Sequence, residues 1–143
     1  MTTSTELSRD VLSEFATAVM ADDYAKAHEQ LAPWLGASTP PDVLRETVLA
    51  RISTAAQALA TVGPLIPVDY RLHITEWTLE DVRGPNRPLP AEVTDESFHA
   101  WACIQFVADE ATGRDSWFDF WCVLCDTPQG VRIGYFELQD VDE

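Results

Sequence analysis

The chain has 143 residues, of which 24 are acidic and nine are basic, so its formal net charge is −15. A chain of this length corresponds to a single domain and can bury roughly 68–70% of its unfolded surface without a metal or a disulfide. Apolar residues make up 46% of the sequence and five of them are Trp, which excludes general disorder.

The charge also narrows the choice of partners and compartment. A field of this sign repels phosphates, so we expect neither nucleic acid nor a membrane as a partner, whereas a basic protein stays compatible. No apolar stretch reaches the roughly 20 residues of a membrane span, and the segment Met1 to Asp10 lacks a secretory pattern. The odd number of cysteines, three, favours a reducing compartment. We therefore predict a cytoplasmic protein.

The first half of the chain has helical periodicity. Apolar residues recur at helical spacing from Leu7 to Val19, which predicts a first helix. Asp22 and Asp23 interrupt this run, and both are suitable N-caps for a second helix from Tyr24 to about Leu31. Pro33 then closes the second helix or leaves a loose final turn.

A third helix is predicted from Asp42 to about Val62, after a loop at residues 36–41. Gly63 and Pro64 end it in the order typical of helix C-termini. Its apolar stripe comprises Leu44, Val48, Ile52, Ala55, Ala56 and Leu59.

The second half of the chain alternates in the manner of strands. A long acidic loop, about Leu79 to Glu96, shows no periodicity, and Gln139 to Glu143 has the composition of an acidic tail. Hairpin-length links at 109–113 and 126–130 predict antiparallel pairing. The predicted strands are Val68–Thr78, Ser97–Ala108, Arg114–Cys125 and Val131–Leu138. Three N-terminal helices packed on a four-stranded antiparallel sheet form a single α+β domain over residues 1–143.

The stretch from Phe15 to Leu31, FATAVMADDYAKAHEQL, resembles the opening of NTF2-like domains of the cystatin-like superfamily. In that family a first helix ends in a short acidic or glycine turn, and an aromatic and a small residue begin the second. The resemblance implies a curved sheet wrapped around a long helix, forming a cone with an internal pocket. The family includes isomerases, dehydratases, transport adaptors and other proteins with pockets, so the fold alone does not fix the function.

Two cysteines have the CxxC spacing that zinc and redox sites use. On a strand, however, Cys122 and Cys125 point to opposite faces and their Cα atoms lie roughly 10 Å apart. This distance exceeds the reach of a disulfide, and no second Cys/His pair lies nearby. We therefore expect buried cysteines, including Cys103, with no metal and no cofactor.

A carboxylate among aromatic residues is the strongest chemical signal. Asp119 lies in the run WFDFW, on the same strand face as Trp117 and Trp121. Burial between two indoles would raise its pKa, as in many general acids and bases, whereas pairing with Arg71 or Arg132 would make it structural.

The hairpin that follows suggests a pocket. If Cys125 faces Val131, then Trp121 faces Tyr135 and Asp119 faces Glu137, which places all four on one face. A one-residue slip in the turn would break this register. The candidate catalytic residues are accordingly Asp119, His99 and Tyr135, and the candidate ligand-binding residues are Tyr24, Trp34, Trp121, Tyr135 and Glu137.

The second and third predicted strands are apolar on both faces. One face packs on the helices, and the other, which carries Trp101 or Trp117 with Trp121, needs a cover. We expect a homodimer through this sheet face.

Three functions stay open. The leading interpretation is an NTF2-like protein that binds a small, partly apolar ligand in its cone without catalysis. The second is an isomerase, dehydratase or hydrolase of a small molecule, with Asp119 as acid or base and His99 or Tyr135 as polarising donor. The third is an acidic interaction or immunity-type protein that masks a basic partner.

Overall fold

The computed structural model describes residues 4–58, 69–75, 77–84, 87–107 and 118–140. Its helices are α1 (Ser4–Met20), α2 (Tyr24–His28), α3 (Pro33–Ser38), α4 (Pro41–Ala58) and α5 (Leu79–Arg83). Its strands are β1 (Asp69–Thr75), β2 (Phe98–Val107), β3 (Phe118–Thr127) and β4 (Gly130–Asp140), which form one antiparallel sheet in that order. The predicted α+β class is therefore confirmed.

Several predicted boundaries change. The segment predicted as a loop at 36–41 begins within α3, so the described residues contain four helices before the sheet, where three were predicted. The predicted acidic tail is wrong at its first two residues, because Gln139 and Asp140 belong to β4. Residues 59–62, 68, 76, 108 and 114–117, which were predicted to be helical or extended, lie outside the described residues, as do 63, 64 and 141–143. Within the described part of the chain, no helix is both long enough and apolar enough to cross a bilayer.

The junction between α1 and α2 shows why the two aspartates lie where they do. Asp22 adopts φ 57°, and the backbone N–H groups of Asp22 and Asp23 donate to the carbonyls of Val19 and Ala18. These two bonds form a Schellman motif, which ends α1. The Asp23 side chain then accepts from the backbone N–H of Lys26 and caps α2. The predicted cap is thus Asp23, whereas Asp22 ends the preceding helix.

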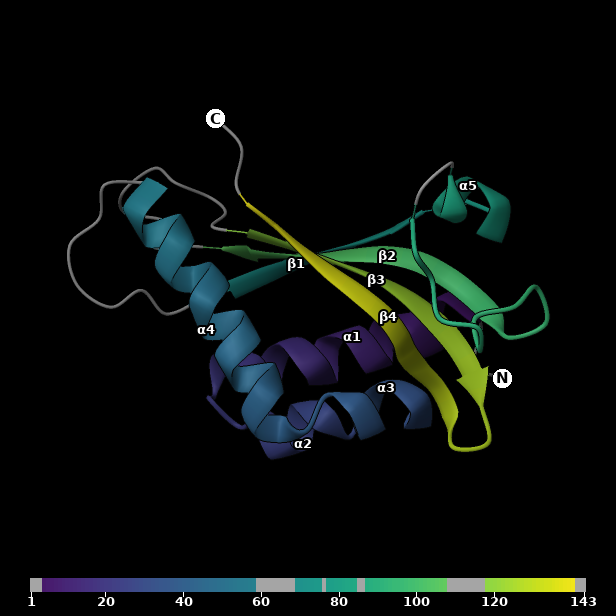
Figure 1. Ribbon diagram of the computed structural model, residues 1–143, viewed down its shortest axis with the longest axis horizontal. Coiled ribbons are helices and arrows are strands. Elements are labelled where there is room, and N and C mark those ends of the chain that lie inside the picture. The colour runs from purple at the N-terminus through teal and green to yellow at the C-terminus, as the bar shows by residue number, and fades with distance from the viewer. Residues whose placement is uncertain (1–3, 59–68, 76, 85–86, 108–117, 141–143) are drawn as a thin grey trace.

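The main core lies between α1 and one face of the sheet, which we call the inner face (Figure 1). The rings of Phe15 on α1 and Phe120 on β3 are 4.8 Å apart, and those of Phe120 and Phe136 are 5.1 Å apart. β1 contributes Tyr70, Leu72 and Ile74 to this core, because alternate residues of a strand lie on the same face. The core includes Val11, Leu12, Ala16, Val19, Tyr24, Leu44, Val48, Ile104 and Leu124.

The opposite, outer face of the sheet is partly covered by the chain itself. The segment 77–84 and 87–97, which we call the strap, crosses it with α5, on the other side of the sheet from α1 (Figure 1). Its buried residues Leu79, Val82 and Val93 pack with Trp101, which is 3% exposed. The predicted acidic loop at about Leu79 to Glu96 is therefore wrong at its first five residues, because Thr78 and Asp81 form a capping box that begins α5.

The homodimer was predicted because an apolar face of the sheet needed a cover. The strap already covers that face around Trp101, whose side chain is buried. Trp117 lies outside the described residues. The oligomeric state itself stays a prediction.

The β3–β4 register differs from the predicted one. Cys125 pairs with Arg132, Trp121 with Glu137 and Asp119 with Gln139. Next to the turn, the pairing is shifted by one residue from the predicted register, since Cys125 was expected to face Val131. A bulge between Val123 and Leu124 shifts the pairing of the earlier residues of β3 by one more. Two one-residue shifts restore the parity of a strand, so Asp119, Trp121, Tyr135 and Glu137 still share the outer face.

Gly134 is the extra residue at this bulge. A Cβ there would lie 2.7 Å from the Cys125 sulfur and 2.9 Å from Cζ2 of Trp34. The Trp34 indole N–H donates to the Gly134 carbonyl at 2.9 Å. The missing side chain therefore lets α3 pack directly onto the sheet.

Candidate functional site

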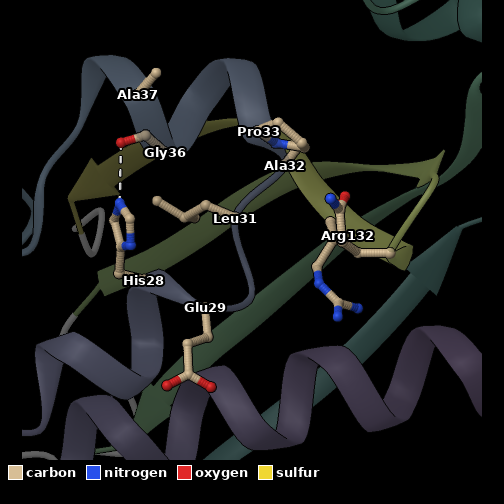
Figure 2. A pocket seen from close by; sticks show the side chains of 9 residues that line it. His28, Glu29, Leu31, Ala32, Pro33, Gly36, Ala37 and Arg132 are labelled. Carbon is tan, nitrogen blue, oxygen red and sulfur yellow. Dashed lines mark hydrogen bonds between the residues drawn. The ribbon is translucent and has the colours of Figure 1, made fainter.

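An open depression of about 580 Å³ lies between α2, α3 and the β3–β4 hairpin (Figure 2). Its volume is in the range of small-molecule sites. Apolar groups make most of its surface, and charged or polar groups flank them. It is lined by His28, Glu29, Leu31, Ala32, Pro33, Gly36, Ala37, Gln129 and Arg132.

A short piece of extended chain forms the base of the depression. Leu31 makes an isolated parallel bridge with Ile133 of β4. The Ala32 N–H donates to the Ile133 carbonyl at 2.7 Å, and the Ile133 N–H donates to the Gln30 carbonyl at 2.8 Å. Pro33 then begins α3, because its fixed φ suits the first turn of a helix and its missing N–H costs nothing there.

The polar groups around the depression are held by few contacts. His28 Nε2 lies 2.9 Å from the Gly36 carbonyl, so this nitrogen carries the proton and links α2 to α3 (Figure 2). Arg132 Nη1 donates to the carbonyl of Val131 at 2.7 Å. The Glu29 side chain is exposed, and in Figure 2 it lies with Arg132 on the side of Leu31 away from Gly36 and Ala37.

The predicted ligand-binding residues do not form one pocket. Tyr24 is 6% exposed and belongs to the inner core, where burial raises its pKa to about 12. Trp34 packs at the edge of the outer cluster, against Gly134. Trp121, Tyr135 and Glu137 do lie together, but on the outer face, separated from Tyr24 by the sheet.

The outer-face group holds the strap in place. Arg87 of the strap donates from Nη2 to Glu137 Oε1 at 3.0 Å, and its guanidinium lies 4.9 Å from the Trp101 ring centroid. The Tyr135 hydroxyl donates to Glu137 Oε2 at 3.0 Å. Burial, together with this bond, raises the pKa of Tyr135 to about 12, so the phenol stays protonated at neutral pH. Trp101 also stacks between Trp77 and Trp121, at centroid distances of 6.3 and 5.3 Å.

Asp119 has partners other than those predicted. It accepts a hydrogen bond from Gln105 on β2, and Gln105 Oε1 lies 3.1 Å from Nε2 of His73 on β1. Burial raises the Asp119 pKa above its ordinary value, although Gln105 and His73 oppose the shift. Arg132 pairs with Cys125, away from Asp119, so this arginine is not its structural partner.

His99 and Tyr135 are not placed to act with Asp119. His99 precedes Gln105, the cross-strand neighbour of Asp119, by six residues, or roughly 20 Å of strand. Its Nδ1 instead lies 3.3 Å from Oδ1 of Asp126. Tyr135 pairs with Val123, four residues from Asp119 along β3, or roughly 13 Å. The three candidate catalytic residues therefore have separate polar partners and do not form one site.

The cysteines lie as their strand positions predicted. Cys122 is part of the inner core and Cys125 of the outer cluster, so they are on opposite faces. Burial raises the pKa of Cys103 to about 12 and that of Cys125 to about 11, which keeps both thiols protonated and unreactive. Among the described residues, no three His, Cys, Asp or Glu side chains gather as they would around a metal ion.

Sequence reasoning missed the depression. Its lining comes from two helices and a hairpin about 100 residues later, and the bridge that joins them involves one residue pair. The local sequence signal for this arrangement was the pair Ala32-Pro33. A residue before proline favours an extended backbone, and Pro33 begins α3.

Comparison of the chain with protein-family models, with curated proteins and with solved structures gave no match.

Proposed function

We propose that this chain is a binding protein without catalytic activity, which takes a small, partly apolar ligand in the depression between α2, α3 and the β3–β4 hairpin. The observation that carries the proposal is the depression itself, with its apolar base of Leu31, Ala32 and Pro33 and charged groups at its margin. This combination is typical of ligand sites, in which apolar surface supplies affinity and a few polar groups orient the ligand.

The proposal moves the site from the interior to the surface. The NTF2-like resemblance implies an internal pocket, but the described residues between α1 and the sheet form a packed core around Phe15 and Phe120. Membership of that family, a cytoplasmic location and a basic protein partner stay predictions. The order of elements, helices followed by an antiparallel meander, supports the first of them.

Replacing Ala37 with Trp should weaken ligand binding, because Ala37 is exposed and lines the depression, so the indole would occupy it. Ligands would be found by NMR screening of a small-molecule library against the isotope-labelled protein. We expect hits to shift amide signals of the lining residues, and Ala37→Trp to weaken them at least about tenfold, the effect of losing a few buried methylenes.

The matched control is Ala25→Trp, at an exposed alanine of α2 that does not line the depression. It should leave the affinities within about twofold, since surface substitutions away from a site have small effects. Hits that bind Ala37→Trp and the unsubstituted protein equally would show that the site lies elsewhere.

An acid–base enzyme is the second candidate, and the surroundings of Asp119 favour it. The raised pKa of its carboxyl group and the hydrogen-bonded series His73, Gln105 and Asp119 provide a group that can exchange a proton nearer to neutral pH. His73 replaces His99 as the histidine in this interpretation.

The Asp119 carboxyl should titrate above 3.9, the ordinary value for Asp. Because folding raises this pKa, the native state holds the proton more tightly, and the contribution of Asp119 to stability falls as pH rises from that value through the native pKa. Gln105→Leu should raise the pKa further, since the hydrogen bond that opposes the shift is lost. Carboxyl NMR titration measures both, with Asp119→Asn identifying the signal. A native pKa at or below 3.9 would remove the case for acid–base chemistry.

A further inference from the structure

Arg132 is the basic group of the depression, and it lacks a carboxylate partner within the described part of the chain. Arg45 and Arg87, by contrast, lie 3.1 and 3.0 Å from carboxylate oxygens of Asp22 and Glu137. With 24 acidic and nine basic residues in the chain, most arginines should find an acid. Arg132 is half-buried at the margin of a mostly apolar depression and has no carboxylate partner among the described residues. Its charge and its remaining N–H donors are therefore available to an anionic ligand.

The Arg132 guanidinium is also oriented. Its Nη1 donates to the Val131 carbonyl at 2.7 Å, which holds the group against the hairpin. The remaining N–H groups keep the planar geometry that matches the two oxygens of a carboxylate. Since the base of the depression is apolar, a ligand bound there can place an apolar body over Leu31 and Ala32 while its charged end meets Arg132.

We propose that the depression binds an organic monocarboxylate with an apolar body, and that Arg132 holds its carboxylate. This inference rests on the proposed function, because it names the ligand class of the same site.

The charges around Arg132 limit which anions can bind. Glu29 also lines the depression, and the chain carries a net charge of −15, so both repel an anion. Physiological salt screens charges beyond about 8 Å, which leaves Arg132 as the closest charge to a carboxylate placed on it. The lining holds one arginine, whose planar guanidinium matches the two oxygens of one carboxylate. A dianion such as a phosphate ester loses more hydration on binding and finds no second arginine there, so a single carboxylate is favoured. His28 and Gln129 supply polar groups for a further hydroxyl or amide of the ligand.

The test compares two probes that differ in their end group, hexanoate and 1-hexanol, titrated separately into the labelled protein and followed by amide NMR. We expect hexanoate to shift signals of the lining residues and to bind at least about tenfold more tightly than 1-hexanol, as expected for a charge-assisted hydrogen bond. Arg132→Gln should reduce hexanoate to the affinity of 1-hexanol and leave 1-hexanol unchanged. Arg132→Lys should retain part of the preference, and Arg45→Gln, at the exposed arginine paired with Asp22, should retain all of it.

Equal binding of the two probes, or full hexanoate affinity in Arg132→Gln, would overturn the carboxylate assignment. If that binding is still lost in Ala37→Trp, the proposed function survives the failure. Binding of neither probe at the depression would overturn the inference, and the library screen with Ala37→Trp then decides the proposed function on its own. Thermal melts followed by circular dichroism establish that each variant is folded.

Discussion

Replacing Phe120 with Ala should lower the free energy of unfolding by about 3–5 kcal/mol, the cost typical of a large aromatic truncated in a packed core. The Phe120 side chain is fully buried, and its ring centroid lies 4.8 Å from that of Phe15 and 5.1 Å from that of Phe136. Removal of the ring therefore leaves a cavity where α1 meets β3 and β4. Urea denaturation followed by fluorescence measures the loss.

The stability of Phe120→Ala also tests whether the space between the helices and the sheet is packed or has room for a ligand. Leu49→Ala, at a residue of α4 that is 37% exposed, should change the stability by no more than about 0.5 kcal/mol and serves as the control. If Phe120→Ala costs less than about 1 kcal/mol, the space between helices and sheet already has room, and the internal pocket of an NTF2-like cone would replace the surface depression as the site.

The inner layer could be predicted because its signals are local. Period-2 alternation predicts that Tyr70, Leu72 and Ile74 share one face of a strand, and all three pack on the inner core. The run from Phe120 to Cys125 alternates between the inner and outer clusters, as expected for a strand. The acidic pair after the first helix likewise predicted a helix boundary, since Asp is favoured at N-caps and tolerates positive φ.

The cover of the outer face was harder to predict. Thr78 and Asp81 have the spacing of a capping box, but the helix that they begin is only five residues long, too short for periodicity to show. Contacts between residues far apart in the sequence hold the strap on the sheet. Its buried apolar residues pack with Trp101, and Arg87 forms an ion pair with Glu137, 50 residues away. No local pattern carries such a pairing, so the outer face was predicted to be open and a dimer was expected.

The candidate site depended on register. Trp121, Tyr135 and Glu137 share a face, as predicted, only because the bulge adds a second one-residue shift to that of the turn. A separate irregularity lies between Phe98 and Ala100, where His99 contacts Asp126. Neither irregularity has a sequence signature strong enough to predict, although a glycine inside a strand, as at Gly134, often marks one.

Replacing Gly134 with Ala should cost about 1–3 kcal/mol of unfolding free energy, the range for overpacking a tight core. The new Cβ would lie 2.7 Å from the Cys125 sulfur and 2.9 Å from Cζ2 of Trp34, so at least one of these groups must move. Displacement of the indole would also strain its 2.9 Å hydrogen bond to the Gly134 carbonyl. Because Trp34 belongs to α3, which also supplies Pro33, Gly36 and Ala37 to the depression, ligand affinity should fall together with stability.

A double-mutant cycle with Cys125→Ala separates this clash from a general effect of alanine in a strand. Cys125→Ala alone should destabilise the protein, since the side chain is fully buried in the outer cluster. In the double variant the sulfur that the new methyl group meets is absent and the nearest Cys125 atom is its Cβ, at 3.4 Å. The double variant should therefore lose less unfolding free energy than the sum of the losses in the two single variants. The difference should be about 0.5 kcal/mol or more, as for residues in contact. Simple additivity would mean that the Cys125 sulfur is not the group that the new methyl group displaces, and that the contact with Cζ2 of Trp34 at 2.9 Å accounts for the cost.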